Sequence, residues 1–192
     1  MERRKLTIII AGMPGSGKTT LARFIAKKYG LKYCAGSDFF KQAASRLGYS
    51  IKGAHWWDSR EGLHFLKERQ KDSRFDREVD RLLLEKARKG GVVMTSWTLP
   101  YLKAPGIKIW IAASQKTRAE RISGRDKTSY KQALAAIRKR DKENRKLYKR
   151  LYGFTLGKDL RPFDIILETD RLSIKQTQAG ISRRIKRFIE SK

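Results

Sequence analysis

The feature that most restricts the fold of this chain is a glycine-rich octapeptide at residues 12–19, Gly-Met-Pro-Gly-Ser-Gly-Lys-Thr. It matches the pattern G-x-x-x-x-G-K-[ST] at every fixed position. A short apolar run, Leu6–Ala11, precedes it, and apolar residues then recur at helical spacing from Thr19 to Tyr29, before Gly30. When a strand, a glycine-rich loop and a helix follow one another in this order, the backbone N–H groups of the loop converge on an anion at the helix N-terminus. The octapeptide therefore predicts a phosphate-binding loop.

Each residue type in this loop has a physical reason. Glycines let the backbone turn so that successive N–H groups point inward. Lys18 is placed to reach the β- and γ-phosphates of a nucleotide, and the Thr19 hydroxyl is a predicted ligand of Mg²⁺. We therefore predict a site for ATP or GTP, with ATP preferred, together with Mg²⁺. The predicted nucleotide contacts are Gly12, Met13, Pro14, Gly15, Ser16, Gly17, Lys18, Thr19 and Thr20.

Predicted strands and helices alternate along the rest of the chain. Continuous apolar runs predict strands near 31–34, 91–95, 107–113 and 163–167. Amphipathic segments predict helices near 37–46, 50–70, 76–89, 115–122, 129–152 and 173–190, the first of them capped by Ser37 and Asp38. This alternation predicts an α/β fold with a parallel sheet between two helical layers and a ligand at the carboxyl ends of the strands.

The chain is strongly basic, with 46 lysines and arginines, 19 acidic residues and a net charge of +27 in 192 residues. Residues 116–150 alone hold 14 basic residues and four acidic ones. Such charge is typical of a solvated helix face, of a clamp on nucleotide phosphates, or of an RNA-binding surface.

Other parts of the composition exclude several classes of protein. A single cysteine excludes an internal disulfide and a multi-cysteine zinc site, and two histidines leave little for a histidine metal centre. No apolar run approaches the roughly 18 residues that a membrane span needs. We expect a cytoplasmic monomer without membrane contact.

Several segments, in this order, resemble the archaeal-type cytidylate kinases, which are nucleoside monophosphate kinases. The segments are GMPGSGKTTLARFIAKKYGLKY, AGSDFFKQAA, FDREVDRLLLEKARKGGVVM, RAERISGRD, AIRKRDKENRKLYKRLYG and FDIILETDRLS. The resemblance implies a three-layer αβα P-loop NTPase fold with a five-stranded parallel sheet. It also implies one P-loop kinase domain over residues 1–192, with an acceptor-binding helical insertion at about 38–88 and a lid region at about 116–150.

The resemblance implies transfer of the γ-phosphate of ATP to CMP or dCMP. Such a transfer depends on positioning, Mg²⁺ and positive charge around the transferred group. Lys18, Arg118 and Arg140 are the implied catalytic residues, with Arg121 and Arg125 as further candidates for lid arginines. The implied contacts to the acceptor nucleotide are Asp38, Lys41, Asn144 and Arg145.

The sequence departs from the family pattern on the acceptor side. Where the family has an acid followed by Gly-Arg, this chain has Thr95, Ser96 and Trp97. Asn144 and Leu147 stand where the family has an aspartate and an arginine, and Lys41 replaces an arginine.

Two further interpretations follow from the residues. Asp141 lies in an apolar helical stripe, so it should either pair with an arginine such as Arg145 at i+4 or face a cleft, and we favour the pair. The alternative function is a kinase-fold ATPase that binds RNA or the ribosome through its basic surface, with little CMP kinase activity. Trp56, Trp57 and Trp97 are its candidates for stacking on bases, although core packing is the simpler role for a tryptophan.

Overall fold

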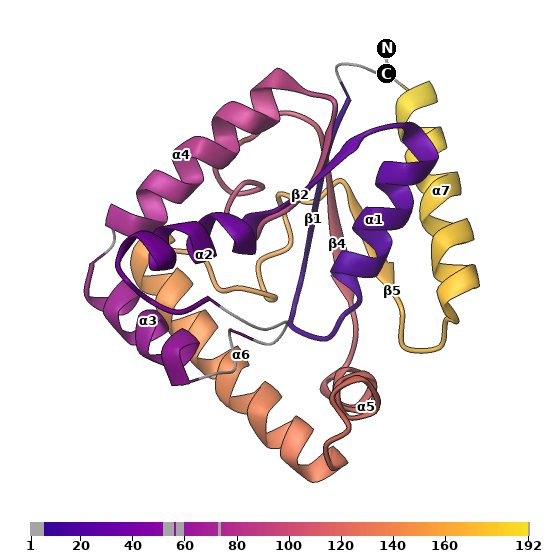
Figure 1. Cartoon of the computed structure of the whole chain (residues 1–192). Helices are drawn as coiled ribbons and strands as arrows, with labels where there is room; N and C mark the ends of the chain where they lie inside the picture. Colours follow the sequence, from indigo (N-terminus) through magenta and orange to yellow (C-terminus); the bar gives the residue numbers. More distant parts are fainter. Residues whose placement is uncertain (1–5, 52–55, 57–59, 73, 192) are drawn as a thin grey trace.

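The computed structural model describes residues 6–51, 56, 60–72 and 74–191, and its centre is one sheet of five parallel strands (Figure 1). The strands are β1 (Thr7–Gly12), β2 (Lys32–Ala35), β3 (Val92–Thr95), β4 (Ile107–Ala112) and β5 (Ile165–Glu168), in the spatial order β2-β3-β1-β4-β5. The helices are α1 (Lys18–Tyr29), α2 (Gly36–Arg46), α3 (Arg60–Lys71), α4 (Arg74–Lys89), α5 (Gln115–Asp126), α6 (Tyr130–Tyr152) and α7 (Ile174–Glu190). The predicted α/β fold with a five-stranded parallel sheet is confirmed.

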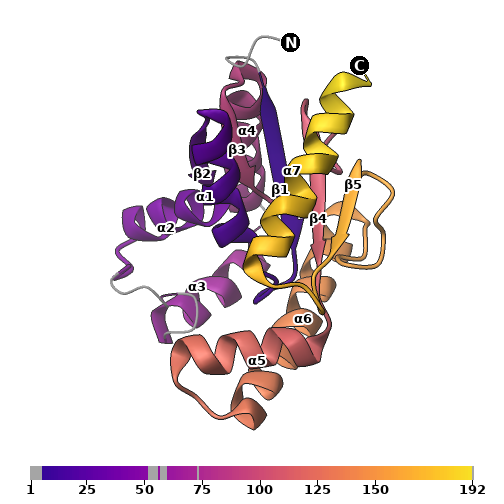
Figure 2. The same ribbon diagram turned by 90° about the vertical axis from the view of Figure 1, so that its right-hand side faces the viewer.

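The central strand β1 is buried along its whole length, as expected for a strand covered by helices on both faces. Ile8 and Ile10 belong to the core formed with α1 and α7, whereas Ile9 belongs to the core formed with α4. This alternation follows from the two-residue period of a strand. Figure 2 shows α1 and α7 together on one face of the sheet.

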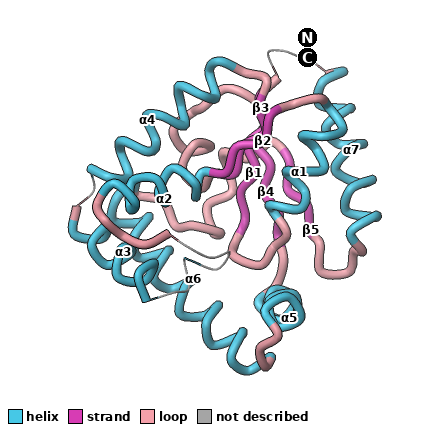
Figure 3. Tube along the Cα trace, in the orientation of Figure 1, coloured by secondary structure: helices cyan, strands magenta, loops and turns pink. Residues whose placement is uncertain are grey.

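All five strands run in the same direction, so their carboxyl ends meet at one edge of the sheet. The helices α3, α5 and α6 lie beyond that edge (Figure 3). This is the edge at which open α/β sheets bind ligands.

Several predicted helix starts differ from the structure: the helix predicted near 50–70 is described from Arg60, that predicted from 76 begins at Arg74, and that predicted from Ser37 begins earlier. Helix α2 begins at Gly36, with Ala35 as its N-cap, and no side chain caps it, so Ser37 and Asp38 lie in its first turn. A Cβ on Gly36 would lie 2.5 Å from the Thr95 carbonyl oxygen, so β2 passes into α2 in close contact with β3. That close approach places the helix start one residue before the predicted cap.

The tryptophan predictions have mixed outcomes. Trp56 is buried and donates its indole N–H to the Ser50 carbonyl (2.6 Å), so it is a core residue and not a surface for bases. Trp57 lies outside the described residues. Across the described ranges, none of the helices has the length and apolar character needed to cross a membrane.

Candidate active site

The predicted phosphate-binding loop connects β1 to α1 at the carboxyl edge of the sheet. Glycine is required at Gly12, because a Cβ there would lie 2.5 Å from the Ile111 carbonyl oxygen of β4. It is also required at Gly15, where the φ of +80° is left-handed and a Cβ would lie 3.2 Å from the Arg118 Cβ of α5. The loop therefore lies tightly between β4 and α5.

The loop has features that fit a bound phosphate group. Gly17 precedes α1 in a left-handed conformation, and Thr19 and Thr20 are exposed in the first turn of that helix, where its dipole is positive. The Ser16 Oγ is buried and has no hydrogen-bond partner among the described residues. Because buried polar atoms are normally paired, this orphaned hydroxyl and the glycine cradle fit an anionic ligand.

Lys18 lies folded back on its own loop. Its Nζ donates to the Met13 carbonyl (3.0 Å) and lies 5.7 Å from the centre of the Trp97 ring. Loss of water around the ammonium, followed by the positive charges of Arg140 and Arg118, lowers the pKa of Lys18 to about 7, against an opposing effect of Asp141. A phosphate bound at this loop would oppose this effect, because a nearby negative charge raises the pKa of a lysine and favours its charged form.

Arg118 is buried and joins three parts of the site. Its Nη1 donates to the Pro14 carbonyl (3.0 Å) and to Asp141 Oδ1 (3.1 Å), and its Nη2 donates to Asp141 Oδ2 (2.6 Å). Asp141 is therefore paired with an arginine, as predicted, but its partner is Arg118 and not Arg145. Arg145 points instead to the segment after α6, where its Nε donates to the Leu156 carbonyl (3.2 Å).

The other predicted arginines divide into two groups. Arg121 links the phosphate loop to the segment after β5, because it donates to the Ser16 carbonyl (3.3 Å) and to the Thr169 carbonyl (2.8 Å). Arg140 is half-buried, and its charge acts on Lys18. Arg125 instead pairs with its neighbour Asp126 on the surface. Arg118 and Arg121 therefore bind carbonyl groups of the loop, whereas Arg140 acts on Lys18 through its charge.

The predicted acceptor residues lie on two different helices. Asp38 is exposed and Lys41 is half-buried on α2, whereas Asn144 and Arg145 are half-buried on α6. Leu147, which the sequence resemblance aligns with an arginine of the family, is buried in the core with Trp110 and Phe154. Its burial explains why an apolar side chain is stable there.

Sequence reasoning missed a buried polar cluster that ties these helices together. Arg69 on α3 pairs with Asp76 on α4 through its Nε and Nη2, donates to the Tyr148 hydroxyl on α6 (3.0 Å) and stacks over the Phe40 ring on α2 (3.9 Å to the centroid). The signal in the sequence was the pair Asp76 and Asp80, two acids at i and i+4 on the apolar stripe of α4.

Asp80 forms a second part of this cluster. It accepts hydrogen bonds from the hydroxyls of Thr98 and Tyr152. Burial raises the pKa of Asp80 to about 6 in spite of these two bonds. The cluster thus fixes α4 against the segment after β3 and against the end of α6.

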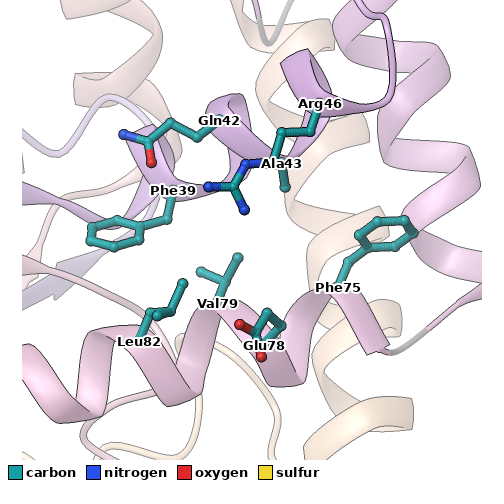
Figure 4. A pocket seen from close by; sticks show the side chains of 8 residues that line it. All are labelled: Phe39, Gln42, Ala43, Arg46, Phe75, Glu78, Val79 and Leu82. Carbon is teal, nitrogen blue, oxygen red and sulfur yellow. The ribbon is translucent and has the colours of Figure 1, made fainter.

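A pocket between α2 and α4 is separate from this site (Figure 4). Phe39, Val79 and Leu82 form its apolar walls, and Arg46 and Glu78 place opposite charges beside it. No residue of the phosphate loop lines it.

Comparison with known proteins decides the family. The model of the cytidylate kinase-like family matches residues 7–171. The chain belongs to the cytidylate kinase-like family. It is 36% identical over 174 residues to a cytidylate kinase of Pyrococcus horikoshii, and the aligned region covers 90% of this chain and 84% of that protein. It is 35% identical over 171 residues to a cytidylate kinase of Pyrobaculum islandicum, with coverage of 88% and 86%.

Among solved structures, the chain resembles the shikimate kinase of Acinetobacter baumannii in complex with shikimate. The TM-score is 0.57 and the identity 19%, over 99% of this chain and 96% of that one. At this identity the likeness concerns the fold alone, and it confirms the predicted P-loop NTPase fold. The resemblance seen in the sequence is confirmed as well, and a member of the cytidylate kinase-like family is an ATP-dependent phosphotransferase.

Proposed function

We propose that this kinase transfers the γ-phosphoryl group of ATP to CMP or dCMP. A phosphate oxygen of the acceptor attacks the γ-phosphorus, the bond from that phosphorus to the β,γ-bridging oxygen breaks, and ADP and CDP or dCDP leave. The observation that carries the proposal is the phosphate loop with Lys18 at its centre and Arg118, Arg121 and Arg140 around it. Family membership supplies the class of acceptor.

The protein contributes positioning and charge to this reaction. The loop N–H groups and the positive end of α1 hold the phosphates, and Lys18 turns from the Met13 carbonyl toward them. Arg118 and Arg140 are the arginines that we propose to act on the transferred group, and the positive charges of both lower the pKa of Lys18. Thr19 would hold Mg²⁺, which neutralises charge on the β- and γ-phosphates when it is bound.

The regions around the site keep their predicted roles in this proposal. The acceptor nucleotide binds between the helical insertion at about 38–88 and α6, where Asp38, Lys41, Asn144 and Arg145 are its candidate contacts. The lid region at about 116–150 contains α5 and α6, and Arg118 joins both helices to the loop. A monomer in the cytoplasm remains the predicted state.

The first prediction concerns the acceptor. With ATP and Mg²⁺, CMP or dCMP should stimulate ADP release at least about tenfold more than UMP or AMP, because a site built for one base rejects others. A coupled assay of ADP release measures this, with Lys18→Ala protein purified in parallel to reveal contaminating kinases. Equal rates with and without every acceptor would contradict the proposal.

The second prediction concerns pH. Since the pKa of Lys18 is lowered to about 7 in the free enzyme, and Arg140, Arg118 and Asp141 face it, the lysine loses its proton as pH rises above 7. A neutral lysine attracts phosphates less, so kcat/KM for ATP should fall from pH 7 to pH 9, by up to tenfold per unit. A kcat/KM that stays flat over this range at constant ionic strength would show that Lys18 does not titrate there.

The RNA-binding alternative gains no support from the comparisons. The charge that suggested it lies on the surface, most densely on α6, whose exposed basic residues are Lys131, Arg138, Lys139, Lys142, Lys146, Lys149 and Arg150. RNA or ribosome binding by this surface remains a prediction that is independent of the kinase activity.

A further inference from the structure

Trp97 occupies an unusual position between the phosphate loop and the acceptor side. It lies two residues after the end of β3, and the N–H of the intervening Ser96 donates to the Ile10 carbonyl (3.2 Å), which continues the pairing of β3 with β1. The Ser96 Oγ then accepts hydrogen bonds from the backbone N–H groups of Thr98 and Leu99 (3.2 Å each), which turns the chain away from the sheet. The backbone at Trp97 is therefore held beside the loop.

Three contacts fix the indole ring of Trp97. Its Nε1 donates to the Gly12 carbonyl of the phosphate loop (2.7 Å). The Tyr148 ring packs edge-on against it, with 5.4 Å between centroids and an interplanar angle of 87°. The Lys18 Nζ lies 5.7 Å from the ring centre, within the range of a cation–π contact.

These contacts differ from ordinary core packing. Trp97 is only half-buried, whereas Trp110 in β4 is 3% exposed and belongs to the same apolar cluster. Tyr148 is itself held by Arg69, so the ring of Trp97 is braced from the acceptor-side helices and bound to the donor-side loop. The Trp97 indole therefore lies beside both the Gly12 carbonyl and Lys18, the lysine of the loop motif.

We propose that Trp97 is a positioning residue of the phosphoryl-transfer site, which holds Lys18 on the loop and keeps water away from the bound triphosphate. The inference rests on the proposed function. A kinase must suppress the reaction in which a water oxygen attacks the γ-phosphorus, the bond to the bridging oxygen breaks, and ADP, phosphate and a proton are released. An apolar ring beside the loop limits water, and its π face keeps the Lys18 ammonium beside the phosphate-binding loop.

The test compares Trp97→Ala, Trp97→Phe and the matched control Trp110→Phe. Trp97→Ala should raise the KM for ATP about tenfold and increase ATP hydrolysis without acceptor, relative to CDP formation, by a similar factor. Trp97→Phe keeps an aromatic face and loses the N–H, so it should recover most of the coupling between ATP use and CDP formation. Trp110→Phe should leave both quantities at the level of the unmodified protein.

Tryptophan emission supplies a readout that a purely structural role would not change. When Mg-ATP binds, its charged phosphates should come close to the Trp97 ring, so the emission should change in the unmodified protein and in Trp110→Phe but not in Trp97→Phe. An equal change in Trp97→Phe, or unaltered coupling and KM in Trp97→Ala, would overturn the inference. If the unmodified protein forms no CDP, the proposed function fails, while the emission and the affinity for Mg-ATP still decide the role of Trp97.

Discussion

Replacing Lys18 by alanine is expected to lower kcat for phosphoryl transfer by roughly 10²- to 10³-fold, the usual effect of removing one charged or hydrogen-bonding group from a transition state. The lysine is the only side chain of the loop motif with a positive charge, and its Nζ lies against the Met13 carbonyl of the loop. The fold should remain intact, because the substitution removes an ammonium whose loss of water already lowers its pKa.

Two measurements separate the loss of chemistry from the loss of binding. Single-turnover rates with saturating ATP report chemistry, and the rise in melting temperature on adding Mg-ATP reports binding. The control is Lys27→Ala, an exposed lysine in the last turn of the same helix, which should behave like the unmodified protein. Activity retained in Lys18→Ala would show that the loop is not where phosphate is transferred.

Replacing Asp141 by asparagine is expected to destabilise the protein by about 3–5 kcal/mol, because it leaves the buried Arg118 without its counter-charge. For a chain of this size, each kcal/mol lowers the melting temperature by roughly 2–4 °C. Activity should fall as well, since Arg118 also binds the Pro14 carbonyl and thereby supports the phosphate loop. Thermal unfolding and the coupled assay measure the two effects.

A surface pair provides the control for this prediction. Asp126→Asn breaks the pair with Arg125, whose side chain is 56% exposed, and should change the free energy of unfolding by less than about 1 kcal/mol. The double variant Arg118→Met, Asp141→Leu should regain most of the stability, because apolar residues can replace a buried ion pair. It should not regain activity. Identical melting temperatures for Asp141→Asn and Asp126→Asn would contradict the structural role given to Asp141.

The sequence predicts those parts of this molecule that depend on local patterns. The phosphate loop is recognisable because its glycines, lysine and threonine must be consecutive to form the cradle. The strand at residues 7–12 is recognisable because both of its faces are buried, which requires an unbroken apolar run. Helix α6 begins where Ser129 and Gln132 form a reciprocal cap, so its start is also encoded locally.

The partners of buried charges were beyond such reasoning. Asp141 lies four residues before Arg145, and that spacing makes them neighbours on an isolated helix. In the folded chain α5 packs along α6, and Arg118 reaches Asp141 from that helix with two hydrogen bonds. Arg69 and Asp76 lie on separate helices, and only the packing of α3 and α4 against α6 places them with Tyr148.

The position of β1 in the centre of the sheet has a consequence for biosynthesis. This strand is made before both of its neighbours, which begin at Val92 and Ile107, roughly 85 and 100 residues later. At about 5–20 residues per second, Ile8, Ile9 and Ile10 wait on the order of 5–20 seconds in an unpaired strand before either neighbour leaves the ribosome. During this interval the nascent chain exposes β1, an apolar segment that is fully buried in the folded protein. Other nascent chains can pair with this unpaired strand.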